Sequence, residues 1–103
     1  MIRATTPTFI FRLPIDCSEI AKAEVTFTQS GENKLTKQTE DCLMSDRKLT
    51  VTLSQEETLL FSDRAEIKTQ LRVLTNDNRV FASQVFSVPV IESLSEEVLR
   101  NDI

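Results

Sequence analysis

The chain contains no histidine, no tryptophan and no tyrosine, and it has a single glycine. Without histidine, neither a serine nor a cysteine has the side chain that usually acts as its general base. Without tryptophan or tyrosine, a sugar site is disfavoured, because such sites place flat amphipathic rings against the pyranose face. One glycine cannot form a glycine-rich loop that cradles phosphates. We therefore expect no enzyme, no cofactor and no small-molecule substrate.

Cysteines and long apolar runs are also scarce. Cys17 and Cys42 are too few for a disulfide framework and lack metal-type spacing, so we predict two free thiols. No segment approaches the ~18 consecutive apolar residues of a membrane helix. Residues 1–7 lack the apolar run of a secretory signal. These absences predict a protein without a signal peptide that is kept in the cytoplasm, away from the membrane.

The charge balance argues against one further class of partner. The formal net charge is −4, and the 12 lysines and arginines are spread along the chain. Nucleic-acid binding requires a basic face for the phosphates, so we expect no nucleic-acid partner. The length of 103 residues fits one domain, and an apolar fraction of 40% is ordinary for a globular protein.

Alternation of apolar and polar residues is the strongest pattern that the chain does have. Between residues 65 and 90, Ile67, Leu71 and Val73 fall on one face of an extended segment, with polar residues on the other. A period of two is typical of a strand with one face on a core. The Asn-Asp-Asn turn at residues 76–78 interrupts the pattern, which then resumes, so this unit predicts a β-hairpin.

The same alternation recurs in residues 8–13, 23–29 and 48–53, and more weakly in residues 35–39. Together these segments predict an all-β fold, an antiparallel sandwich of six or seven strands over residues 1–92. The predicted core is made of the odd-numbered apolar residues of these strands: Phe9, Phe11, Val25, Phe27, Leu49, Val51, Leu53, Ile67, Leu71 and Val73.

Three strands are predicted to lie at sheet edges: the mostly polar residues 35–39 and two that contain or adjoin proline. Pro7 and Pro14 flank residues 8–13, and proline cannot donate a hydrogen bond to a neighbouring strand. The final strand, residues 86–90, contains Pro89 and is the second predicted edge. An unpaired edge offers main-chain donors and acceptors to another chain.

Two serines stand three residues before a glutamate, which is the spacing of a helix capping box. The first, Ser54, predicts one or two helical turns over residues 55–60, crossing from one sheet to the other. The second, Ser93, predicts a short helix within a C-terminal tail, residues 93–103. Such a short helix is marginal alone in water, so it is either docked or ordered only on a partner. The alternative is a frayed terminus.

The two phenylalanines of the last strand leave two alternatives open. In a regular strand, Phe81 and Phe86 lie on opposite faces. Either the strand contains a β-bulge, or one ring faces outward beside Val85 and forms a small contact patch.

Several segments resemble small proteins encoded in the tail and baseplate gene regions of phages and prophages of Gram-positive bacteria. The similar segments are residues 3–9, 23–29, 53–58, 70–75 and 82–83. The resemblance covers roughly residues 3–92. It implies an immunoglobulin-like β-sandwich akin to the N-terminal modules of baseplate upper proteins, with a structural or accessory role in the virion. It carries no catalytic or ligand-binding residues.

The combined hypothesis is a non-enzymatic protein–protein interaction module of a phage or prophage tail. Its expected partners are phage structural proteins or a second copy of itself, in the virion or in the host cytoplasm before assembly. The alternative is a host-directed binding or regulatory protein expressed during infection. The candidate contact residues lie on the last strand and in the tail: Phe86, Val88, Leu94, Val98 and Leu99.

Overall fold

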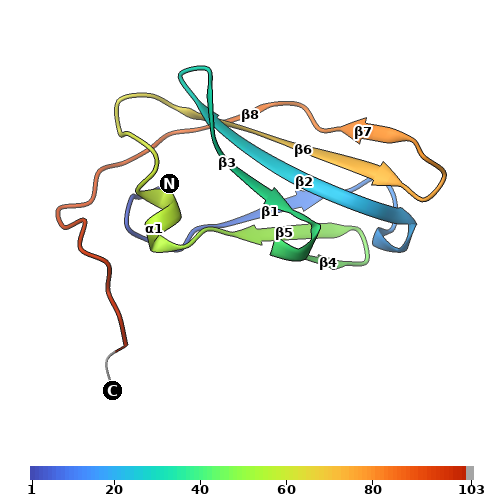
Figure 1. The fold of residues 1–103 in the computed structure, drawn as a ribbon, viewed down its shortest axis with the longest axis horizontal. Helices are drawn as coiled ribbons and strands as arrows, with labels where there is room; N and C mark the ends of the chain where they lie inside the picture. Colours follow the sequence, from blue (N-terminus) through green and yellow to red (C-terminus); the bar gives the residue numbers. More distant parts are fainter. Residues whose placement is uncertain (102–103) are drawn as a thin grey trace.

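The computed structural model describes residues 1–101, which form two antiparallel β-sheets packed face to face (Figure 1). The smaller sheet has the order β1-β5-β4, with β1 at Thr8–Arg12, β5 at Lys48–Thr52 and β4 at Cys42–Ser45. The larger sheet has the order β3-β2-β6-β7, and β8 also pairs with β6. Its strands are β2 (Ile20–Gln29), β3 (Glu32–Gln38), β6 (Ile67–Thr75), β7 (Val80–Ala82) and β8 (Phe86–Val88). The predicted all-β sandwich is confirmed.

The core lies between the two sheets and is built from the predicted odd-numbered residues. Nine of the ten predicted core residues are buried, and Phe9 is half-buried. The ring of Phe27 meets the rings of Phe9 and Phe61 edge to face, at centroid distances of 5.4 and 6.3 Å. Phe61 lies outside any strand and closes one end of the core, as the sequence predicts for residues 59–61.

The predicted crossing helix is present and shorter than expected. Helix α1 spans Gln55–Thr58 and joins β5 of the smaller sheet to β6 of the larger. Its capping box is complete, because the Ser54 hydroxyl accepts from the Glu57 N–H and the Glu57 carboxylate accepts from the Ser54 N–H. After the helix, Leu59 is half-buried and Phe61 is buried, but Leu60 is exposed, so the prediction that all three close the end of the core was wrong for Leu60.

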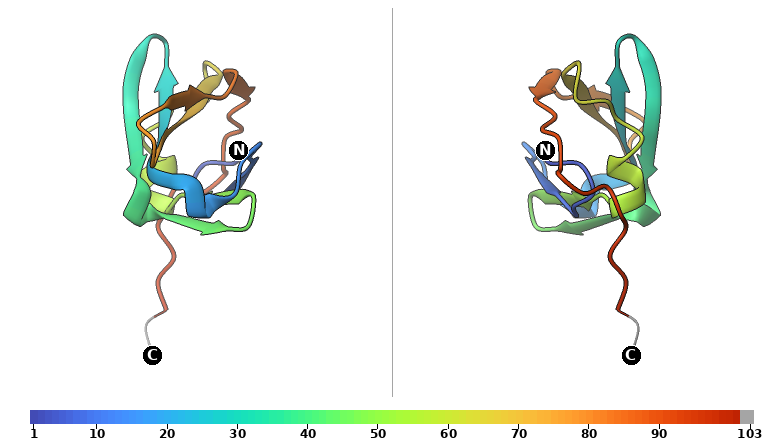
Figure 2. Two further views of the ribbon diagram at one scale, coloured as in Figure 1. Left: turned by 90° about the vertical axis from the view of Figure 1, so that its right-hand side faces the viewer. Right: turned by 90° about the vertical axis from the view of Figure 1, so that its left-hand side faces the viewer.

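The two long sides of the sandwich differ. On one side, the short 3₁₀ helix η2 (Thr39–Asp41) carries the chain from β3 to β4 and joins the two sheets. The Thr39 hydroxyl is hydrogen-bonded to both the N–H and the C=O of Ala23, which fixes this crossing. On the other side, β1 and β8 are both edge strands, and no strand of residues 1–101 lies between them (Figure 2). The sandwich is therefore closed on one side and open on the other.

A β-bulge divides the strand that the sequence predicted between residues 79 and 90. Both β7 and β8 pair with β6, but three residues, 83–85, separate them where β6 has only two, 70–71. The extra residue brings Phe81 and Phe86 to the same face, the one that carries the buried Thr69. The structure thus shows a bulge rather than an outward-facing ring.

The C-terminal tail does not form the predicted helix. Residues 92–101 are irregular and run away from the sandwich (Figure 1). Local hydrogen bonds compete with a helix here, because the Ser93 hydroxyl donates to the Ser95 carbonyl. The Gln55 side chain also holds Leu99, accepting from its N–H and donating to its carbonyl. The helix prediction was wrong for these physical reasons.

Candidate protein-interaction groove

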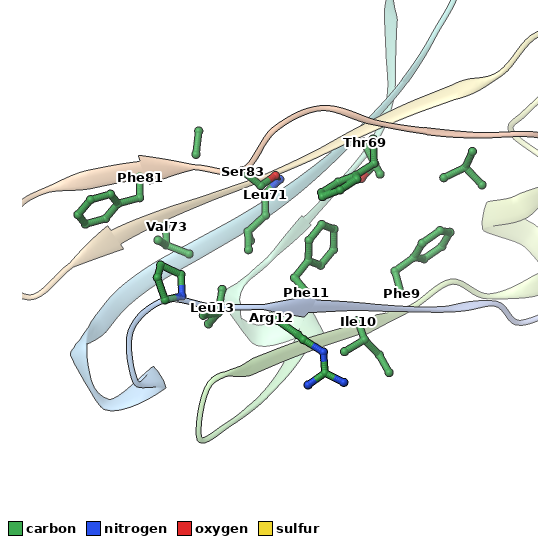
Figure 3. A pocket seen from close by; sticks show the side chains of 14 residues that line it. Phe9, Ile10, Phe11, Arg12, Leu13, Thr69, Leu71, Val73, Phe81 and Ser83 are labelled. Carbon is green, nitrogen blue, oxygen red and sulfur yellow. The ribbon is translucent and has the colours of Figure 1, made fainter.

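An apolar groove of about 460 Å³ runs along the open side of the sandwich, between β1 and the layer formed by β6, β7 and β8 (Figure 3). We call it the edge groove. Its apolar lining includes residues of both layers: Phe9, Phe11, Leu71, Val73, Phe81 and Phe86. Its volume is in the range of ordinary ligand and peptide sites.

Aromatic rings from both layers meet across the edge groove. The rings of Phe11 on β1 and Phe86 on β8 lie edge to face, with centroids 6.1 Å apart. Phe81 and Phe86 belong to the inner face, yet they are 44% and 42% exposed. Residues on an inner face are normally covered, so these exposed fractions show that the core is left open here. Contiguous exposed apolar surface of this kind marks interaction sites.

Strand β1 presents unpaired main-chain groups to the edge groove. The Leu13 N–H donates to the Arg47 carbonyl at 2.8 Å, and the Leu53 N–H donates to the Pro7 carbonyl at 3.0 Å. Odd-numbered residues of β1 therefore direct their main chain toward β5, and alternate residues of an antiparallel strand point the other way. The groups directed away from β5 belong to three residues: Thr8, Ile10 and Arg12.

The bulge shapes the opposite wall. The Leu71 N–H donates to the Ser83 hydroxyl at 3.0 Å, and the Ser83 N–H donates to the Leu71 carbonyl at 2.8 Å. The Gln70 amide donates to the Ser83 carbonyl at 2.9 Å. Ser83 thus satisfies the main chain at the point where the strand pairing shifts, and it fixes the bulge that turns both rings into the edge groove.

One polar group in the lining has no partner. Thr69 is 2% exposed, and its Oγ1 makes no hydrogen bond within residues 1–101. Leaving a buried polar group unsatisfied costs about 1–3 kcal/mol. An occupant of the edge groove that supplied a hydrogen bond would recover part of that free energy.

The outer face of β1 carries positive charge. Arg12 lies directly opposite Lys48 of β5, and neither makes an ion pair with another described residue. Like charges directly opposite each other on a sheet are destabilising. Figure 3 shows the Arg12 side chain pointing away from the edge groove, toward this outer face. A carboxylate placed beside Arg12 would relieve the repulsion.

The clearest pKa shifts lie outside the edge groove. Burial works to raise the pKa of Glu57, but hydrogen bonds from Lys37 and Ser54 and the Lys37 charge hold that pKa below its ordinary value. Burial raises the pKa of the Cys42 thiol, and the Asp41 carboxylate raises it further. The shift of Cys42 keeps the thiol protonated, which is the less reactive form.

Both cysteines are free, and they contact different carbonyls. The Cys17 thiol donates to the Lys48 carbonyl, and the Cys42 thiol donates to the Gln38 carbonyl. Across residues 1–101, no group of three or more His, Cys, Asp and Glu side chains is arranged to hold a metal ion. The polar groups of the edge groove are hydroxyls and main-chain amides, which can bind a peptide.

The structure separates the candidate contact residues into two places. Phe86 and Val88 line the edge groove. Leu94 and Leu99 are exposed in the tail, at 102% and 78%, and Val98 is half-buried. Because the tail is not helical, Leu94 and Val98 do not share a helix face.

The sequence did not indicate that β1 and Phe81 belong to one site. Phe9 and Phe11 were assigned to the core, whereas they also form the wall of the edge groove. The signal that was present is the pair of prolines around β1, because it predicted an edge. The strand order is needed to know that the edge of β1 and the edge of β8 lie on the same side of the sandwich.

Comparison with known proteins identifies no family, because no family model, no curated protein and no solved structure matches the chain. None of the helices within residues 1–101 is long and apolar enough to cross a membrane.

Proposed function

We propose that this protein is a non-enzymatic protein–protein interaction module that binds its partner through the edge groove. The observation that carries the proposal is the open side of the sandwich, where rings from both layers stay exposed between two unpaired strand edges. Such a surface offers apolar area and main-chain hydrogen bonds together, which is what protein partners use in strand addition.

Within this proposal, the partner is a structural protein of a phage or prophage tail or baseplate. The support is the resemblance of residues 3–92 to small proteins of such gene regions, together with the β-sandwich fold that the resemblance implied. A sandwich with one open edge can be added to a larger assembly without refolding, because the contact surface already exists.

The experiment uses a lysine at one of two neighbouring positions on β7. Phe81 faces into the edge groove, whereas Val80 does not line it and is 56% exposed. Phe81→Lys should reduce the amount of the protein in purified phage particles at least about tenfold, which corresponds to ~1.4 kcal/mol of lost binding. Val80→Lys introduces the same charge one residue away and should leave incorporation unchanged.

Quantitative mass spectrometry of the purified particles measures the amount of each variant relative to that of the wild-type protein. If the wild-type protein is absent from particles and is instead recovered with a host protein, the virion role is wrong and the host-directed alternative stands. If Phe81→Lys and Val80→Lys are incorporated equally, the edge groove is not the contact surface.

A further inference from the structure

We propose that the edge groove receives a single extended segment of a partner polypeptide, which inserts as an additional β-strand beside β1 and faces β8. This inference rests on the proposed function and specifies its partner: a free segment with apolar side chains at alternate positions and one carboxylate opposite Arg12.

The two sheet edges on the open side are arranged so that one strand can lie between them. The free edge of β1 and the edge strand β8 lie on the same open side, one in each layer (Figure 2). The main-chain groups of Thr8, Ile10 and Arg12 point into that opening. A strand placed there gains hydrogen bonds from β1 while its inner face covers the exposed rings of Phe81 and Phe86.

The edge groove also requires a particular sequence pattern of the inserted strand. A strand beside five-residue β1 spans about 17 Å, at ~3.3 Å per residue, and directs alternate side chains inward and outward. The inward side chains meet an apolar lining, so they must be apolar. The outward position opposite Arg12 faces the unpaired charges of Arg12 and Lys48, which favour a carboxylate.

Two segments of this chain itself fit less well. In the tail, Glu96 stands between Leu94 and Val98, so an extended tail would direct a carboxylate inward together with the two apolar residues. Strand β1 of a second copy is already paired with its own β5 along one edge. Its insertion would therefore place the whole smaller sheet of that copy in the opening between β1 and β8. A partner segment that has both edges free and apolar residues at every inward position avoids both problems.

The probe is a synthetic peptide, Asp-Val-Thr-Val-Thr-Val, with blocked ends. Paired antiparallel to β1, it places its aspartate opposite Arg12, its threonines outward and its valines in the edge groove. One control peptide, Val-Val-Val-Asp-Thr-Thr, has the same composition without alternation. A second, Asp-Val-Pro-Val-Pro-Val, removes two of the three amide hydrogens that would face β1.

The measurement is amide hydrogen exchange of the full-length protein by NMR, with and without each peptide. Exchange at Thr8, Ile10 and Arg12 should slow when the alternating peptide is present. Phe9 and Phe11 should not change, because their main chain already faces β5. This alternate pattern separates strand addition from simple contact with an apolar surface.

Substitutions in the protein test the charge and the apolar wall. Arg12→Gln should weaken the binding of the alternating peptide about fivefold, as expected for the loss of one exposed ion pair. Arg64→Gln, which lies outside the edge groove and makes no ion pair with a described residue, should have no effect. Phe81→Lys should abolish binding, whereas Val80→Lys should preserve it.

Three results would overturn the inference: no binding at a peptide concentration of about 1 mM, equal binding of the non-alternating peptide, or binding without slower exchange at the three β1 residues. Particle incorporation of Phe81→Lys tests the proposed function separately. If that incorporation is lost while the peptide fails, the edge groove is a contact surface for a folded partner, a second copy included, rather than for a free strand.

Discussion

At the scale of single residues, burial decides which apolar side chains stabilise the fold. Leu49 of β5 and Leu43 of β4 are neighbours in the same sheet, yet Leu49 is 0% exposed and Leu43 is 77% exposed. They lie on opposite faces of the smaller sheet, because Leu43 is paired with Thr50, whereas the preceding residue, Leu49, points toward the larger sheet. This pair therefore tests the assignment of the core with one kind of substitution.

We predict that Leu49→Ala lowers the free energy of unfolding by about 2–5 kcal/mol, since it leaves a cavity in a closed part of the core. Leu43→Ala, the matched control, should lower it by less than ~0.5 kcal/mol, because it only shortens an exposed side chain. Urea titration measures both. Equal losses for the two variants would mean that the inner face of the smaller sheet has been misassigned.

One ion pair has a defined dependence on pH. The Lys37 ammonium lies 2.7 Å from a Glu57 carboxylate oxygen, and the two side chains are only 13% and 24% exposed. The pKa of Glu57 is lower in the folded protein than its ordinary value of 4.5. A lowered pKa contributes stability above the ordinary value, and that stability is lost as the pH falls through the folded-state value.

We predict that Glu57→Gln lowers the free energy of unfolding by about 1 kcal/mol at neutral pH, since the pair is only partly exposed and also supports the helix cap. The difference from the wild-type protein should disappear well below pH 4.5. The control, Glu24→Gln, breaks the more exposed Arg72–Glu24 pair and should change stability by less than ~0.5 kcal/mol. A difference for Glu57→Gln that persists in acid would assign the effect to packing instead.

At the scale of elements, the bulge between β7 and β8 determines the shape of the open side. Without the extra residue, Phe81 and Phe86 would lie on opposite faces of the sheet, and one ring would leave the edge groove. Ser83 stabilises this irregular point through its hydroxyl, which is the acceptor for the Leu71 N–H.

We predict that Ser83→Ala destabilises the protein by about 1–2 kcal/mol, because the half-buried Leu71 N–H loses its acceptor. Exchange of the Leu71 amide hydrogen should become faster, while exchange in the pairing of β2 with β6 stays slow. Ser87→Ala on exposed β8 removes a hydroxyl with no hydrogen bond within the described residues and serves as the control. Unchanged exchange at Leu71 would show that another group holds the bulge.

The sequence predicted the regular parts of the fold, whereas it left some irregular parts open and missed others. The alternation placed the core, the prolines placed β1 at an edge, and Ser54 placed the helix cap, because each effect is local. Whether a bulge or an outward ring accommodates Phe81 and Phe86 depends on pairing with β6, which no local pattern contains. The edge groove depends on two edges far apart in the chain. The prediction of a tail helix was wrong because the main-chain N–H and C=O of Leu99 are hydrogen-bonded to the Gln55 side chain instead.

At the scale of the whole molecule, residues 1–3 are hydrogen-bonded to residues 89–91. The Met1 amine donates to the Pro89 carbonyl at 2.7 Å. The Ile91 N–H donates to the Met1 carbonyl at 2.8 Å, and the Arg3 N–H donates to the Ile91 carbonyl at 3.0 Å. The fold therefore extends through Ile91, and the tail begins after it.

The tail itself contributes little to this packing. It is attached by exposed contacts: the Gln55–Leu99 hydrogen bonds, an ion pair between Arg3 and Glu96, and one between Arg100 and Glu56. Exposed ion pairs contribute about 0–1 kcal/mol each. Leu94 is fully exposed. The tail is thus available for contact with another molecule.

We predict that a chain ending at residue 92 melts within about 3 °C of the full chain, whereas a chain ending at residue 88 melts lower by at least about 5 °C. The second truncation removes all three hydrogen bonds between the termini, and ~1 kcal/mol corresponds to about 4–8 °C in a domain of this size. Removing the tail should also weaken self-association or particle incorporation, because Leu94 and Leu99 bury apolar area only on a partner. Thermal melting and sedimentation of both truncations separate the two effects. Unchanged melting with unchanged association would exclude the tail as a contact element and leave the edge groove as the surface through which this sandwich binds.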